Sequence, residues 1–74
     1  MPKAGINLLR LGLNIHRWRH GMRLTQAELA AKVGCGKGTI LAIEHGRRDV
    51  SVGMLFRLSS TLTCPLKELL QGVE

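Results

Sequence analysis

The stretch from Leu24 to Gly46, LTQAELAAKVGCGKGTILAIEHG, constrains the fold of this chain more than any other segment. Thr25 and Glu28 have the spacing of a capping box, in which the threonine hydroxyl and the glutamate carboxylate each accept from the other residue's backbone N–H. A short helix therefore begins directly after Thr25. Its apolar positions form one stripe: Leu29, Ala30 and Val33. Gly34 follows, where glycine most easily takes the left-handed conformation that ends a helix.

A second short helix begins after the turn Gly34-Cys35-Gly36 and ends at Gly46. At about 100° per residue, its inward side carries Ile40 and Ile43, with Glu44 beside them. Its opposite side carries Gly38, Ala42 and His45. Two helices joined by a tight glycine-containing turn, the second with a free face, predict a helix-turn-helix, whose second helix lies in the DNA major groove. An ordinary helical hairpin has the same periodicity, so this stretch alone leaves both open.

Three further helices are predicted around this pair. Apolar residues at three- and four-residue spacing mark a first helix, interrupted by Gly12: Leu8, Leu11, Ile15, Trp18 and Met22. Ser51 is a good N-cap for a fourth helix, whose inward positions are Val52, Leu55, Leu58 and Leu62. Pro65 suits the first turn of a fifth helix, whose apolar residues are Leu66, Leu69 and Leu70.

The expected fold class is all-α, a compact five-helix bundle forming a single domain over residues 1–74, with a flexible arm at 1–5 and a frayed end at 71–74. A core this small favours self-association. We expect a homodimer through the fourth and fifth helices, with Phe56, Leu70 and Val73 in the interface. The first helix is the alternative surface, because Ile6, Leu9 and Leu13 lie off its inward stripe; a broad core face explains them equally well.

Charge is distributed unevenly along the chain. The formal net charge is +6, and residues 1–48 hold nine Lys and Arg against two acids, whereas residues 49–74 hold two against three. A basic first two-thirds fits a surface that meets a polyanion such as DNA. The alternative is that these basic residues only keep a small protein soluble.

The sequence argues against disulfides, metals and catalysis. Cys35 and Cys64 stand where aliphatic residues would fit, so we expect two small buried thiols in a reducing cytoplasm. His16 and His20 lie outward on the first helix, four residues apart, but lack a third ligand, so we expect a solvated or phosphate-facing edge there, and no metal or cofactor is predicted. The sequence has no carboxylate cluster, nucleophile–base pair or phosphate loop, which predicts that the chain is not an enzyme. No apolar run is long enough to predict membrane insertion.

Two charged residues fall on inward helix faces. Arg19 shares the side of Ile15 and Trp18, and Glu44 shares the inward side of the second motif helix. Burying either charge alone costs several kcal/mol of hydration, so we predict that the two residues pair. This pair would join the first helix to the second helix of the motif.

Over residues 11–70 the chain resembles the Cro/C1-type (Xre-like) helix-turn-helix family of phage and bacterial regulators. The matching segments are residues 15–19, LTQAELAAKVG, TI..IE.G, the R-x-x-S start of the fourth helix, and PLKELL. EHGRRDVS is similar to restriction–modification controller proteins in particular. The resemblance implies a lambda-repressor-like fold, a role in transcription regulation, and the same Arg19–Glu44 pair.

The resemblance also implies which residues meet DNA. Gln26 is expected against the DNA backbone, because a helix N-terminus attracts phosphate through its free N–H groups and its dipole. The base-reading positions are Lys37, Gly38 and Ala42, flanked by Thr39 and Leu41. The predicted DNA-binding set is Gln26, Gly36, Lys37, Gly38, Thr39, Leu41, Ala42, Arg47 and Arg48.

The chain departs from the family at the base-reading positions, where relatives commonly carry Ser, Gln, Arg or Asn. Glycine and alanine offer no hydrogen bond to a base edge, whereas Lys37 can reach guanine, and Leu41 and Ala42 can touch thymine methyls. Two functions remain open. The first is a cytoplasmic, nucleoid-associated, homodimeric regulator of a palindromic operator. The second is a protein-interaction module of the same fold, antitoxin-like or bridging.

Overall fold

The chain folds into five α-helices, and across the described residues 6–74 it contains no strand. In this computed structural model the helices are α1 (Leu8–Gly21), α2 (Gln26–Val33), α3 (Lys37–Glu44), α4 (Val52–Leu62) and α5 (Leu66–Leu69). The predicted all-α, five-helix architecture is therefore confirmed. The predicted arm at residues 1–5 lies outside the described part. No helix within residues 6–74 has the length and apolar character needed to cross a membrane.

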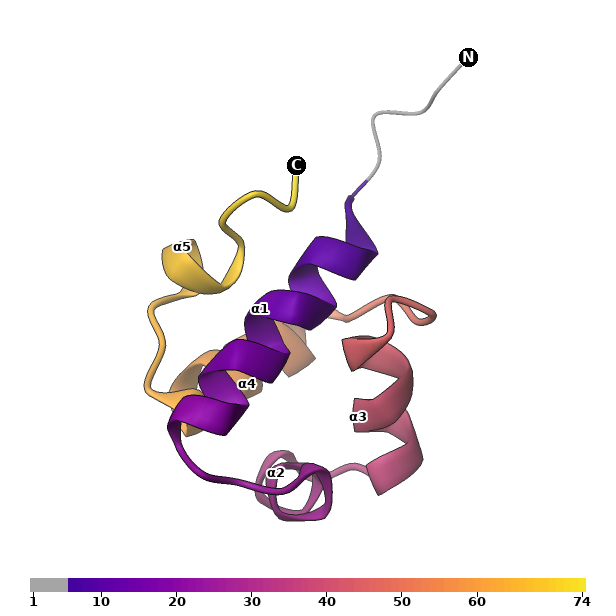
Figure 1. Cartoon of the computed structure of the whole chain (residues 1–74), viewed down its shortest axis with the longest axis vertical. Coiled ribbons are helices and arrows are strands. Elements are labelled where there is room, and N and C mark those ends of the chain that lie inside the picture. Colours follow the sequence, from indigo (N-terminus) through magenta and orange to yellow (C-terminus); the bar gives the residue numbers. More distant parts are fainter. Residues whose placement is uncertain (1–5) are drawn as a thin grey trace.

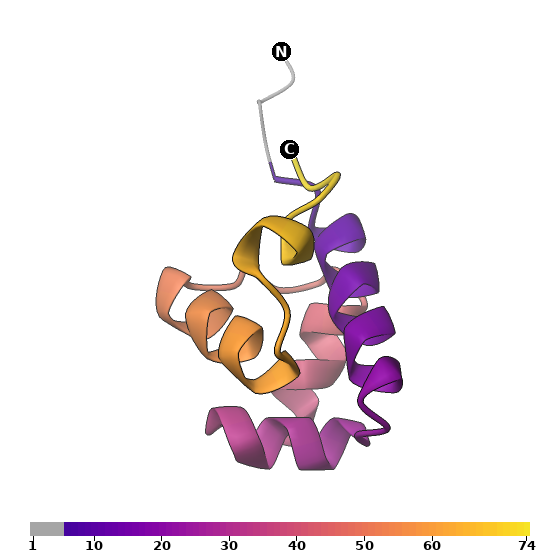
Figure 2. The same cartoon turned by 90° about the vertical axis from the view of Figure 1, so that its left-hand side faces the viewer.

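The helices pack around α1, which runs along most of the length of the molecule (Figures 1 and 2). α2 crosses the end of the molecule where α1 finishes, and α5 lies beside the end where α1 begins. α3 packs against α1 and α2, and α4 packs against α1, α2 and α5. This arrangement holds α3 against two helices while one of its sides remains uncovered.

Local side-chain caps set where the helices begin. In the capping box of α2, the Glu28 N–H donates to Thr25 Oγ1 at 3.0 Å and the Thr25 N–H donates to Glu28 Oε1 at 2.8 Å. Ser51 caps α4 through the Met54 N–H, as predicted. Asn7 caps α1 in the same way through the Arg10 N–H. Gly34 is left-handed, with φ +83°, and ends α2 as expected.

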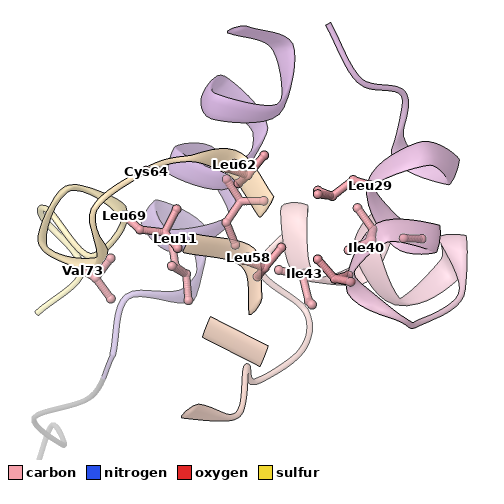
Figure 3. Packing of buried hydrophobic residues seen from close by; sticks show 12 residues of the cluster. Leu11, Leu29, Ile40, Ile43, Leu58, Leu62, Cys64, Leu69 and Val73 are labelled. Atoms are coloured by element: carbon pink, nitrogen blue, oxygen red, sulfur yellow. The ribbon is translucent and has the colours of Figure 1, made fainter. Parts of the chain in front are cut away.

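Most of the core comes from the inward sides of the helices, and Cys64 and Val73 join it from the segments before and after α5 (Figure 3). Its buried apolar residues are Leu11, Ile15, Leu29, Ala30, Val33, Ile40, Ile43, Leu58, Leu62, Cys64, Leu69 and Val73. Cys64 is buried and Cys35 is half-buried at the edge of the cluster, and both are free thiols. Burial, followed by the nearby Glu68 carboxylate, raises the pKa of the Cys64 thiol.

Two residues predicted to face inward are exposed. Met22 is the C-cap residue after the last turn of α1, and its side chain is 42% exposed. Val52 is 68% exposed because it is the first residue of α4, and the first turn of that helix protrudes beyond its neighbours (Figure 2). Both predictions extended a helical stripe to a helix end, where the packing partners stop.

The prediction of a frayed C-terminal end is wrong. Val73 is buried, and its carbonyl accepts from the Asn7 N–H at 2.6 Å. The buried Asn14 amide donates to the carbonyls of Leu69 and Gln71, both at 2.9 Å. These bonds satisfy carbonyls that the short α5 leaves free. Val73 therefore belongs to the core of the chain itself and is not available for a dimer interface.

At Gly12 the backbones of α1 and α3 come close together. A Cβ at this position would lie 2.5 Å from the Glu44 carbonyl oxygen and would also overlap the Ile43 carbonyl oxygen. Backbone atoms cannot move aside as the end of a side chain can. The glycine that interrupts the stripe of α1 is therefore required by the packing of α3.

We predict that Gly12→Ala lowers the free energy of unfolding by about 1–3 kcal/mol, because the added methyl group overpacks this crossing. Helix propensity alone would give the opposite sign, a gain of about 1 kcal/mol. Urea denaturation of the wild type and the variant measures the difference. Gly38→Ala is the matched control, because a Cβ there meets nothing within 4 Å and this variant should be at least as stable as the wild type. A Gly12→Ala variant of unchanged or greater stability would contradict the close packing.

Candidate nucleic-acid interface

The uncovered side of α3 forms one continuous surface on the molecule. Ile40 and Ile43 are buried beneath it. Lys37, Gly38, Leu41 and His45 are exposed, and Thr39 and Ala42 are half-buried. Leu41, a large apolar residue, is 43% exposed at the centre of this side. We call residues 36–39, 41, 42 and 45 the α3 face.

The start of the α3 face presents backbone more than side chains. Gly36 is the N-cap of α3 and supplies no side-chain cap, while its carbonyl accepts from the N–H groups of Thr39 and Ile40. Within residues 6–74 no acceptor bonds to the N–H of Lys37 or Gly38. A Cβ at Gly36 or Gly38 would meet nothing within 4 Å, so the fold itself does not require glycine at either position. Such a helix N-terminus attracts anions, and here a phosphate can come close to it.

A basic loop follows the α3 face. Gly46 has φ +70° and packs so tightly on α1 that a Cβ would lie 2.9 Å from Leu9 Cα. The Arg47 N–H donates to the Ala42 carbonyl at 2.9 Å, which folds the loop back onto α3. Arg47 and Arg48 are exposed and form no ion pair within the described residues. Two uncompensated cations therefore flank the α3 face.

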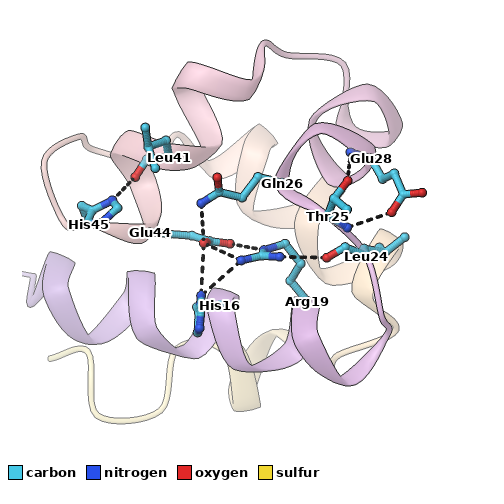
Figure 4. A network of polar contacts seen from close by, with 9 residues as sticks. All are labelled: His16, Arg19, Leu24, Thr25, Gln26, Glu28, Leu41, Glu44 and His45. Carbon is cyan, nitrogen blue, oxygen red and sulfur yellow. Dashed lines mark hydrogen bonds and ion pairs between the residues drawn. The ribbon is translucent and has the colours of Figure 1, made fainter.

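Arg19 and Glu44 form the predicted ion pair (Figure 4). Arg19 Nε donates to Glu44 Oε2 at 2.6 Å, and Arg19 Nη2 donates to Glu44 Oε1 at 3.1 Å. The remaining nitrogen, Nη1, donates to the Leu24 carbonyl at 2.8 Å. The side chains are only 8% and 3% exposed. One guanidinium group thus bonds α1 to α3 and to the residue that precedes the α2 capping box.

Two further side chains complete this network. Gln26 Nε2 donates to Glu44 Oε1 at 3.1 Å, and His16 Nδ1 lies 3.3 Å from the same oxygen and 3.2 Å from Arg19 Nη2. The sequence led us to place His16 on a solvated or phosphate-facing edge, but the structure turns its Nδ1 into the network. The sequence contains a signal for this contact, because His16 precedes Arg19 by three residues and side chains at that spacing are neighbours on a helix.

Gln26 is half-buried at the edge of the α3 face, with its amide bonded to Glu44. This bond uses one of its two N–H donors and leaves the other donor and the carbonyl oxygen. The contact of Gln26 with phosphate stays a prediction. The remaining predicted residues lie together on the α3 face and in the basic loop beside it: Gly36, Lys37, Gly38, Thr39, Leu41, Ala42, Arg47 and Arg48.

The network shifts the pKa of Glu44 downward. Burial alone would raise this pKa, but the hydrogen bonds from Arg19, then Gln26, then His16 outweigh burial and hold the carboxyl group ionised. The ionised form is therefore part of the folded structure. The ionised Glu44 carboxylate stabilises the fold at pH values above those at which a carboxyl group ordinarily titrates. This stabilisation is lost as pH falls through the lowered pKa of Glu44.

Within residues 6–74, no three His, Cys, Asp or Glu side chains come close enough together to hold a metal ion. The rings of His16 and His20 lie with their centroids 4.3 Å apart and tilted by 49°. His16 already faces Glu44 and Arg19 through Nδ1. The two histidines are thus neighbours on α1 without a third ligand in the described part of the chain.

This geometry defines a helix-turn-helix protein, in which α2 supports α3 and α3 presents its outer face. The family model described as Helix-turn-helix matches residues 15–69, and the chain belongs to this Cro/C1-type family. No curated protein matches the chain.

Three solved structures extend the comparison. The restriction–modification controller protein C.AhdI from Aeromonas hydrophila is 27% identical over 84% of this chain and 94% of its own, with a TM-score of 0.80. The P22 c2 repressor, solved with a synthetic operator, is 29% identical over the same shares, with a TM-score of 0.78. A chain of the SinR protein/SinI protein complex is 27% identical over 84% of this chain and 61% of its own, with a TM-score of 0.79. The chain has the fold of transcription regulators and repressors.

We predict that Glu44→Ala lowers the free energy of unfolding at neutral pH by about 3–5 kcal/mol, because it leaves the Arg19 charge buried and unpaired. The difference from the wild type should narrow as pH falls below the ordinary carboxyl range, because the wild type then loses the ionised carboxylate as well. Urea denaturation over a pH series measures both effects. Glu68→Ala, at an exposed site on α5, should change stability little. An unchanged midpoint in Glu44→Ala would refute the structural role of the pair.

Proposed function

We propose that this chain is a sequence-specific DNA-binding transcriptional regulator that acts as a homodimer on a palindromic operator, in the cytoplasm and on the nucleoid. One observation carries the proposal: the α3 face is open and lies between a helix N-terminus and the basic loop, and within residues 6–74 the first N–H groups of that helix and the two cations of that loop have no partner. Such a face fits the major groove, and its cationic edge fits the flanking phosphates. No catalytic group or cofactor is part of the proposal.

The contacts divide into base and phosphate contacts. Lys37 is the one long cationic side chain within α3, and it is exposed, so it can reach guanine acceptors. Leu41 and Ala42 can contact thymine methyl groups. We assign phosphate contacts to Gln26, Thr39, Arg47 and Arg48, and close backbone approach to Gly36 and Gly38. Because few side chains can read bases, most of the affinity should come from phosphates.

The similarity of this chain to solved DNA-binding regulators supports the proposed class of function. C.AhdI is described as a controller protein and the P22 c2 repressor is in complex with operator DNA, and each covers 84% of this chain. Two recognition helices related by two-fold symmetry would contact half-sites about 34 Å apart. We carry the palindromic site over to this chain on that geometric ground.

For the dimer we propose the outer side of α4. Val52 and Phe56 are four residues apart on this helix and are 68% and 58% exposed. Leu70, which directly precedes the C-terminal residues 71–74, is half-buried. It therefore contributes less exposed surface to a dimer interface than the sequence led us to expect. The outer side of α1, with Leu9 and Leu13, remains the alternative.

A protein-interaction module is the second candidate function. The observation that favours it is the small, apolar centre of the α3 face, where Gly38, Leu41 and Ala42 offer no hydrogen-bonding side chain. The SinR protein, which has a similar fold, was solved in complex with another protein, SinI. Loss of DNA preference in the experiment below would favour this function.

The main test is selection of bound sites from random duplex DNA, followed by salt titration of the selected site. Affinity should fall by roughly 0.9 log units per log unit of salt for each phosphate neutralised. Lys37→Ala should weaken the binding free energy by about 1–3 kcal/mol on the preferred site only. Arg47→Ala should weaken binding to all DNA sequences alike and reduce the dependence of affinity on salt. Lys67→Ala is the matched control and should change neither, because Lys67 is an exposed cation on α5, which lies on the other side of α1 from α3 (Figure 1). Equal affinity for all duplexes at physiological salt would exclude the proposed specificity.

The dimer surface has its own test. Phe56→Glu should shift the chain from dimer to monomer in sedimentation experiments at micromolar concentration, because it buries a charge in the α4 contact. Leu13→Glu places the same charge on the outer side of α1 and should leave the dimer intact. The reverse result would move the interface to α1, and a wild-type monomer at high micromolar concentration would exclude both surfaces.

A further inference from the structure

His45 ends the α3 face and is not among the residues that the sequence assigned to DNA. It is the C-cap of α3 and lies on the same side as Gly38, Leu41 and Ala42 by helical spacing. It directly precedes the basic loop. Its side chain is exposed, beside Leu41 (Figure 4). A DNA duplex lying on the α3 face would therefore meet its ring.

One hydrogen bond sets the orientation of this ring. His45 Nδ1 lies 2.8 Å from the Leu41 carbonyl oxygen. A carbonyl oxygen only accepts, so Nδ1 carries the proton in this contact. In the neutral ring Nε2 is then a bare acceptor, which repels a phosphate oxygen. Only after a second proton binds to Nε2 can the ring donate to phosphate while it keeps the bond to Leu41.

The charged groups near His45 leave its ring without an ion-pair partner within residues 6–74. Those on the elements packed against this end of α3 are Glu44 on α3, Arg47, Arg48 and Asp49 in the loop, and Arg10, His16, Arg17 and Arg19 on α1. Glu44 bonds to Arg19, Gln26 and His16, and Arg10 lies against Gly72. Within residues 6–74 no ion pair joins His45 to a carboxylate. A phosphate group would thus be the first close anion for this ring.

We infer that His45 is a phosphate-contacting residue that binds in its doubly protonated form, so that DNA affinity rises as pH falls through the range in which imidazole titrates. This inference rests on the proposed DNA-binding function. The Leu41 hydrogen bond carries it, because that bond prevents the neutral ring from offering Nε2–H to DNA. The imidazolium also interacts favourably with the C-terminal end of the α3 dipole.

The test is the dissociation constant for one duplex at about pH 6 and about pH 8, at constant ionic strength, by fluorescence anisotropy. The wild type should bind roughly 3- to 10-fold more tightly at the lower pH. His45→Gln should lose this ratio and should bind at both pH values about as the wild type does at the higher one. His45→Lys carries a permanent charge and should bind tightly at both. Circular dichroism at each pH checks that the variants fold.

His20→Gln is the matched control, because His20 is an exposed histidine on α1 and should leave the pH ratio intact. A wild-type ratio near one, a ratio that persists in His45→Gln, or affinity that rises with pH would overturn the inference and leave the proposed function standing. Absence of DNA binding by the wild type at both pH values would overturn the proposed function itself, and the inference with it.

Discussion

The bond between Arg19 and Glu44 is the interaction on which the rest of this structure depends. α3 has eight residues, and a helix of this length is marginal by itself, so its position must come from packing. Ile40 and Ile43 supply the burial, which is non-directional. The two-pronged contact of the guanidinium with the carboxylate adds direction, because a rotation or a slide of α3 would break one of its two hydrogen bonds. The side chains of the α3 face are aimed outward as a result.

Glycine acts in two opposite ways in the same motif. Gly12 and Gly46 lie where α1 and the end of α3 come so close that a Cβ would meet backbone atoms. These two residues set the distance between the helices, and the ion pair sets their rotation. Gly36 and Gly38 lie in open space, so their lack of a side chain affects only what approaches from outside. Gly12 and Gly46 are thus required by the fold, whereas Gly36 and Gly38 leave the surface of α3 accessible to a ligand.

The α3 face combines a small apolar centre with a polar edge. Leu41 and Ala42 lie at the centre, and Lys37, His45 and Arg47 lie around it. Edge contacts of this kind depend on salt and, for histidine, on pH, whereas apolar contacts depend on neither to the same extent. A regulator built in this way would discriminate weakly by hydrogen bonding and would depend on phosphate contacts and on DNA shape. The same apolar centre explains why a protein partner remains the second candidate function.

Local sequence determined the helices and the motif. The capping box of Thr25 and Glu28, the N-cap of Ser51 and the left-handed Gly34 depend on neighbours within a few residues, and periodicity alone brought Arg19 and Glu44 to facing sides. Only the tertiary structure decided what lies far apart in the chain. Asn14 holds the C-terminal residues and buries Val73, Gly12 is fixed by the backbone of α3, and the amide of Gln26 turns to Glu44. The physical reason is range: caps and stripes act over one or two helical turns, whereas burial and backbone approach depend on which distant element lies alongside.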